Sequence, residues 1–161
     1  LSLGTADQGG EMADAGEALD FVTQLLDSQF RRARIRIVRE AGSVPAVLAM
    51  PRRELIQVLL NLMINARDAM AAGGTLTLGC RNDGEYGFLT IVDTGVGIPP
   101  EILGRIFTPF FTTKGTKGTG LGLSVAESLV RASGGLIQVK SQPGRGTTFT
   151  VQIPLARKER V

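Results

Sequence analysis

The sequence DTGVG at Asp93–Gly97 and the sequence GTGLG at Gly118–Gly122 decide how this chain is interpreted. The first follows residues 88–92, whose β-branched and aromatic content predicts a strand. The second begins the stretch 121–132, whose apolar periodicity predicts a helix. About twenty residues of loop-like composition separate the two glycine clusters.

A carboxylate at a strand end, followed by glycines, can hold the polar edge of a ring because the backbone approaches closely there. Glycines at the start of a helix expose N–H donors that suit phosphate. Together the clusters predict a nucleotide site, with the base at Asp93 and the phosphates at Gly118–Gly122.

A polar stripe on the preceding helix supports this interpretation. Residues 52–71 predict a helix with an apolar face, and Glu54, Asn61, Asn65 and Asp68 line up on another face at spacings of seven, four and three. Such residues in an apolar helix are costly unless they meet a ligand, water or each other. The alternative is an ordinary stripe that faces solvent. The predicted apolar face consists of Leu55, Leu59, Leu62, Met63, Ala66 and Met70.

Five stretches resemble the motifs of one family. Residues 60–70 resemble the N box of the histidine-kinase ATP-binding domain, which belongs to a wider group with type II topoisomerases, Hsp90 and MutL. Residues 93–97 resemble its G1 box, 107–111 its F box, 118–122 its G2 box and 144–149 its late Gly-x-Gly-Thr element. The motifs stand in the family's order and span residues 50–155.

Strands and helices mix without regular alternation, which predicts the α+β class with a mixed, largely antiparallel sheet and helices on one face. The resemblance implies the two-layer α/β sandwich of the Bergerat ATP-binding fold. The predicted domains are a linker or disordered end at 1–14, an ATP-binding kinase catalytic domain at 15–155 and a charged tail at 156–161. The first helix is predicted with Ala18, Val22, Leu25 and Leu26 on its apolar face.

The resemblance implies ATP and Mg²⁺ as cofactors. Asp93 would accept a hydrogen bond from the exocyclic amine of adenine and so select against guanine, which has an oxygen there. Gly95 and Gly97 would let the backbone pass near the ring. Asn65 would supply an amide oxygen to Mg²⁺, a metal that takes few protein ligands.

The phosphates would be held from several sides. Asn61 would face them one turn before Asn65, and Thr147 or Thr148 would close the far wall. Phe107 and Phe110 would seat the lid on the core, or would be ordinary core aromatics. The remaining predicted contacts are the lid lysines Lys114 or Lys117 and the residues of the second glycine cluster, Gly118, Thr119, Gly120, Leu121 and Gly122.

Asp68 departs from the family's pattern, because many histidine kinases carry a basic residue three positions after the magnesium asparagine. Asp68 stays in the predicted cofactor-binding set. The neighbouring Arg67 points about 100° away around the helix. We therefore expect the phosphate contacts to depend more on Asn61 and the lid lysines.

The implied reaction transfers the ATP γ-phosphate to a histidine. The chain contains no histidine, so the acceptor would lie on a separate dimerisation domain, and no catalytic residue is assigned here. Asn61 favours transfer over hydrolysis, because the topoisomerase and MutL branches have a glutamate there and an amide is no general base. The alternatives are a serine kinase of the anti-sigma type, a degenerate domain that only binds, and a hydrolysing motor or clamp domain.

Composition limits the other possibilities. A chain of 161 residues with a net charge of +3 fits one domain, and its basic residues lack the interleaved aromatics of a nucleic-acid surface. The lone Cys80 excludes a disulfide within the chain. With no apolar span or signal peptide, we expect a cytoplasmic location or the cytosolic part of a membrane-bound kinase. The expected partners are its own dimerisation domain and a response regulator, with a homodimeric full-length protein and a monomeric fragment.

Overall fold

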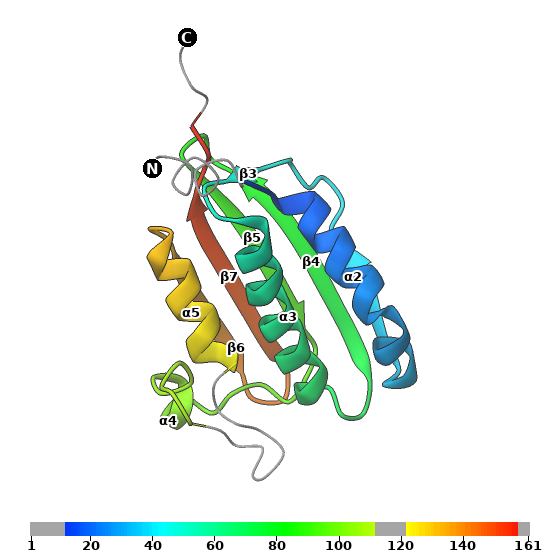
Figure 1. Ribbon diagram of the computed structural model, residues 1–161. Coiled ribbons are helices and arrows are strands. Elements are labelled where there is room, and N and C mark those ends of the chain that lie inside the picture. Colours follow the sequence, from blue (N-terminus) through cyan, green and yellow to red (C-terminus); the bar gives the residue numbers. More distant parts are fainter. Residues whose placement is uncertain (1–11, 112–121, 158–161) are drawn as a thin grey trace.

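The structure, a computed structural model, describes residues 12–111 and 122–157. Helices α2, α3 and α5 lie on one face of a five-stranded sheet, so the molecule has two layers (Figure 1). The predicted α+β sandwich is confirmed. The elements are β1 (Ala13–Asp14), α2 (Ala15–Arg32), β2 (Ile35–Arg39), β3 (Val47–Leu48), α3 (Arg52–Ala69), β4 (Gly74–Asn82), β5 (Tyr86–Asp93), α4 (Pro100–Leu103), α5 (Gly122–Ala132), β6 (Leu136–Gln142) and β7 (Gly146–Pro154).

The large sheet has the strand order β2-β4-β5-β7-β6. Strand β2 runs parallel to β4, and the other neighbouring pairs are antiparallel, as the sequence predicts. The parallel pair requires a crossover, which α3 supplies on the helix-covered face. Strand β7, the last in the chain, lies between β5 and β6 (Figure 1).

The core forms between the sheet and the helices. All six residues of the predicted apolar face of α3 are buried, and they meet the inward-facing residues of β4, β5 and β7. Burying one such side chain contributes about 1.5–3 kcal/mol. Helix α3 is therefore fixed over the middle of the sheet, which determines where its polar stripe lies. In the described part of the chain, no helix is both long enough and apolar enough to cross a membrane.

The start of the domain differs from the prediction in two respects. Asp14 caps α2 through a 3.0 Å bond from the Glu17 amide to its Oδ1, and residues 13–14 pair with β3, so the predicted linker cannot extend to residue 14. Leu25 is 55% exposed whereas Leu26 is 2% exposed. Successive helical residues point about 100° apart, so only one of the two leucines can face the sheet.

Candidate functional site

Three polar residues form a row at one end of the helix-covered face of the sheet. Asp93 on β5 lies opposite Thr147 on β7, and Thr147 lies opposite Ser141 on β6. Residues directly opposite one another in antiparallel strands share a face. Asp93 and Thr147 are only 3% and 4% exposed, in a layer that is otherwise apolar.

The Asp93 carboxylate is oriented by the backbone. Its Oδ1 accepts from the Gly95 amide at 2.8 Å and from the Thr147 amide at 3.2 Å. Burial raises the pKa of Asp93, and these two hydrogen bonds partly oppose that shift. No described residue bonds to Oδ2, so this carboxylate can accept a further hydrogen bond from a ligand. The predicted position of Asp93 at the strand end is confirmed.

The glycines of the loop after β5 serve close backbone packing. A Cβ on Gly95 would lie 2.4 Å from the Ala69 carbonyl oxygen, to which the Val96 amide donates at 3.0 Å. A Cβ on Gly97, where φ is 76°, would lie 2.2 Å from the Gln142 carbonyl oxygen. The loop is thus held between the end of α3 and the β6–β7 turn, and this fixes the surroundings of Asp93.

Ser141 belongs to the site, although sequence reasoning missed it. Its Oγ accepts from the Ile98 amide at 2.7 Å and lies 2.8 Å from Thr147 Oγ1. It therefore joins the loop after β5 to the far side of the polar row. Only the strand register identifies Ser141, because a single serine in an exposed edge strand has no distinctive pattern.

The prediction that Thr148 could close the far wall of the site is wrong. It lies opposite Val92 in the sheet, one residue out of phase with the pair Asp93 and Thr147. Successive strand residues point to opposite faces, so Thr148 faces away from the helices and from Asp93. Of the two predicted threonines, only Thr147 lies in the row.

Asn61 joins α3 to α5. Its Nδ2 donates to the Gly122 carbonyl oxygen at 2.9 Å, and its Oδ1 accepts from Gln57 Nε2 at 2.8 Å. Gly122 is the first residue of α5, so the structure brings a predicted N-box residue beside the end of the predicted G2 cluster.

Asn65 and Asp68 lie further along the same helix. No described residue bonds to the Asn65 side-chain amide, which is half-buried. Asp68 Oδ1 lies 3.2 Å from Arg67 Nη2, and Arg67 Nη1 donates to Gln29 Oε1 at 2.7 Å. Arg67 therefore bends towards Asp68, although their backbone positions diverge around the helix.

The described residues fit the predicted Mg²⁺ site, in which Asn65 is the only protein ligand named. The described residues contain no cluster of three His, Cys, Asp or Glu that could hold a metal by themselves. Mg²⁺ usually keeps several waters and phosphate oxygens and takes only one or two protein ligands. An amide such as Asn65, whose side chain has no partner among the described residues, fits that requirement.

The predicted lid contributes little that can be described. Residues Lys114, Lys117, Gly118, Thr119, Gly120 and Leu121 lie outside the described residues. Phe107 packs edge-to-face on Phe149, with 6.3 Å between ring centroids. Phe110 is 74% exposed, at a φ of 67°. Phe107 is seated on the core as predicted, and Phe110 is not, because its backbone turns it outward.

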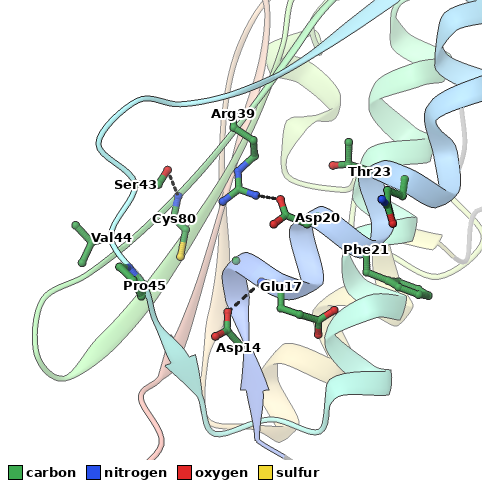
Figure 2. A pocket seen from close by; sticks show the side chains of 12 residues that line it. Asp14, Glu17, Asp20, Phe21, Thr23, Arg39, Ser43, Val44, Pro45 and Cys80 are labelled. Carbon is green, nitrogen blue, oxygen red and sulfur yellow. Dashed lines mark hydrogen bonds and ion pairs between the residues drawn. The ribbon is translucent and has the colours of Figure 1, made fainter.

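A separate cavity of about 790 Å³ lies towards the other end of β4, beside the start of α2 (Figure 2). An ion pair between Arg39 and Asp20 crosses it, and Cys80 lines one wall. Burial raises the pKa of the Cys80 thiol, which disfavours the reactive thiolate. None of the predicted site residues lines this cavity.

Comparison with known families gives one match over most of the chain. Residues 50–157 match the family described as histidine kinase-, DNA gyrase B-, and HSP90-like ATPase. The sensor histidine kinase ZraS of Salmonella typhi is 40% identical over 143 residues, which are 88% of this chain and 30% of ZraS. The chain thus spans about a third of the length of this curated relative.

Solved structures with a similar fold are histidine kinases. The nucleotide-free catalytic domain of ThkA superimposes with a TM-score of 0.79 at 29% identity, covering 89% of this chain and 97% of that one. ThkA in complex with the response regulator TrrA gives 0.72 at 26% identity, covering 89% and 41%. Full-length ShkA in complex with AMPPNP gives 0.76 at 30% identity, covering 92% and 32%.

Proposed function

Because this chain belongs to the histidine kinase-, DNA gyrase B- and HSP90-like ATPase family, we propose that it is the ATP-binding catalytic domain of a two-component sensor histidine kinase. It binds ATP with Mg²⁺ and supplies the γ-phosphate to a histidine on its own dimerisation domain. A response regulator receives the phosphoryl group afterwards. We place the domain in the cytoplasm, where ATP is available.

The oriented Asp93 carboxylate is the observation that carries the proposal. Its Oδ1 is already occupied by two backbone amides, so Oδ2 is left to accept from the ligand. An acceptor at this position matches the exocyclic amine of adenine and opposes the carbonyl oxygen of guanine. Gly95 and Gly97 keep the surrounding loop close to α3 and to the β6–β7 turn, and Thr147 completes the wall.

The phosphates then lie beside the polar stripe of α3. Asn61 and the Gly122 end of α5 face them, and Asn65 gives its amide oxygen to Mg²⁺. When bound, Mg²⁺ supplies positive charge to the phosphate oxygens during transfer. The lid lysines Lys114 and Lys117, together with residues 118–121 of the G2 cluster, complete the phosphate contacts. Asp68 lies at the margin of the proposed site.

Transfer requires an acceptor that this chain does not contain, since none of its 161 residues is histidine. Phosphoryl transfer depends mainly on positioning of the reactants and on stabilisation of charge. This domain can supply both, although the Asn61 amide cannot act as a general base. The dimerisation domain brings the histidine and makes the full-length protein a homodimer, whereas the isolated fragment is a monomer.

Labelling in trans tests the proposal. The chain is incubated with Mg²⁺ and γ-labelled ATP, alone and with the histidine-bearing helical domain of the same kinase. We expect no label on the chain alone, acid-labile label on the added domain, and slow background hydrolysis. The matched control is the added domain with its acceptor histidine replaced by glutamine, which should stay unlabelled.

Two results would contradict the proposal and point elsewhere. Rapid ATP hydrolysis by the chain alone would indicate a motor or clamp domain. Acid-stable label on an added protein would indicate a serine kinase.

A further inference from the structure

Gln57 begins a chain of hydrogen bonds that ends at α5. It lies on α3 one turn before Asn61, on the exposed side of the helix. Gln57 Nε2 donates to Asn61 Oδ1 at 2.8 Å, and Asn61 Nδ2 donates to the Gly122 carbonyl oxygen at 2.9 Å. Gln57 lies outside the motifs that resemble the family, and it was not named among the residues of the predicted polar stripe, although it lies between Glu54 and Asn61 on the same side of α3.

The Gly122 carbonyl, at the end of this series of hydrogen bonds, fixes which atoms donate and which accept. A backbone carbonyl can only accept, so the Asn61 side chain must turn its nitrogen towards Gly122. Its oxygen then faces back along α3, where only a donor can satisfy it. The Gln57 amide is that donor. Without Gln57, the oxygen of Asn61 would have no donor, and the bond to Gly122 alone would hold this orientation of the amide.

We propose that Gln57 is a positioning residue that holds the Asn61 amide with its nitrogen towards the phosphates of ATP. This rests on the proposed function. The amide nitrogen carries two hydrogens, and Gly122 takes one of them, so the second can be donated to a phosphate oxygen. The oxygen of Asn61 is occupied by Gln57 and is not offered to the metal.

The proposal divides the work between the two asparagines of α3. Asn61 acts as a donor to anionic oxygens because Gly122 and Gln57 together fix its amide, Gly122 at the nitrogen and Gln57 at the oxygen. Asn65, one turn later, has no partner among the described residues and keeps its oxygen for Mg²⁺. One neighbouring side chain thus distinguishes two identical amides.

The test uses two variants of similar shape, Gln57→Met and Gln57→Glu. Methionine removes the donor, and glutamate replaces it at neutral pH with an acceptor that attracts the Asn61 nitrogen. We expect ATP affinity, measured by calorimetry, to fall about threefold to tenfold in Gln57→Met and further in Gln57→Glu. Adenosine affinity, measured from amide chemical shifts, should not change, because the surroundings of Asp93, where the base binds in the proposed function, are untouched.

Lowering the pH separates positioning from simple charge repulsion. A glutamate titrates near pH 4.3, and its protonated form can donate to Asn61 Oδ1. At about pH 4.5, with each affinity divided by that of the parent at the same pH, Gln57→Glu should bind ATP better than Gln57→Met. Loss of repulsion alone would bring Gln57→Glu only to the level of Gln57→Met, and this result would overturn the proposal.

The control is Gln138→Met, the same chemical change at an exposed position on β6, which should leave both affinities unchanged. If Gln57→Met weakens ATP and adenosine equally, Gln57 has only a structural role and the proposal fails. If Asn61→Ala weakens ATP binding and neither Gln57 variant does, the proposal fails while the proposed function stands. A parent that binds neither ligand would overturn both.

Discussion

The two halves of the proposed nucleotide site, a base half around Asp93 and Thr147 and a phosphate half around Asn61, Asn65 and Asp68, are built differently. In the base half, Asp93 and Thr147 are almost fully buried, and backbone amides hold the carboxylate. In the phosphate half, Asn65 is half-buried and the Asp68 side chain is 32% exposed, and side chains make the contacts. The sheet constructs the first half as part of the fold, whereas the second half lies on a helix surface.

This difference predicts different responses to change. In the base half, a Cβ added at Gly95, Gly97 or Gly146 would meet a main-chain atom, so substitution of these glycines should cost the fold stability. In the phosphate half, whose contacts are made by partly exposed side chains, one side chain can be removed while the fold is kept. Added volume at these glycines should therefore lower stability, whereas the loss of a side chain in the phosphate half should lower binding alone.

The largest effect should come from Gly146→Ala, which would place a Cβ 2.0 Å from the Asp93 carbonyl oxygen at a φ of 125°. We expect a loss of about 3 kcal/mol of unfolding free energy from strain and overpacking. Chemical denaturation measures it. The control Gly144→Ala also has a positive φ, of 79°, but meets nothing within 4 Å, and should lose about 1 kcal/mol. Equal losses in the two variants would show that the base half is not tightly packed.

Asp93→Asn should separate binding from stability within the base half. The amide oxygen can still accept from Gly95 and Thr147, so its nitrogen takes the place of Oδ2 and faces the adenine amine. ATP binding should weaken by about 1–3 kcal/mol, and discrimination against GTP should narrow. Calorimetry with both nucleotides measures this. An unchanged ATP affinity would refute the assignment of the base to Asp93.

The pH dependence of the parent gives an independent check on Asp93. Its pKa in the folded state is raised by burial, so its contribution to stability is present at low pH and is lost as pH rises through the folded pKa. Asp93→Asn should remove that part of the pH dependence and should be at least as stable as the parent at pH 7. ATP affinity of the parent should fall as pH is lowered through the same raised pKa. A variant less stable than the parent at neutral pH would contradict the burial cost.

The smallest effect should come from Asn65→Ala in the phosphate half. The fold should keep its unfolding free energy within about 0.5 kcal/mol, because the half-buried amide bonds to no described residue. The Mg²⁺-dependent part of ATP binding should weaken by about 1 kcal/mol, and adenosine binding should be unchanged. Titrations of ATP with and without Mg²⁺ measure the difference. An identical response of variant and parent to Mg²⁺ would exclude Asn65 as the ligand.

Sequence patterns predicted the elements that position the site. The apolar spacing of α3 and the strand that ends at Asp93 are both local patterns, and both are confirmed. The order of the motifs also identified the family, which residues 50–157 match. These features depend on short stretches, in which hydrophobic periodicity or a glycine indicates the local structure directly.

Two site residues were missed and two predictions were wrong, for different reasons. Ser141 joins the site only through the register of β6 on β7, which no local pattern states. Thr148 could have been excluded, because the alternation through Phe149 and Val151 places Thr147 with the buried residues. Gln57 was missed because its role depends on a carbonyl on another helix, Gly122. The prediction that Phe110 is seated on the core was wrong. Its backbone has a positive φ, which is unusual for an aromatic residue and which the sequence does not indicate.

The position of β7 has a consequence for synthesis of the protein. Strand β7, the last strand that the structure describes, lies inside the sheet, and its Thr147 amide bonds to a carboxylate made 54 residues earlier. While the ribosome still holds β7, the inner edge of β5 is unpaired and the base half does not exist. We therefore expect nucleotide to stabilise the domain only after β7 has paired, and a chaperone that covers the β5 edge to have its greatest effect before then.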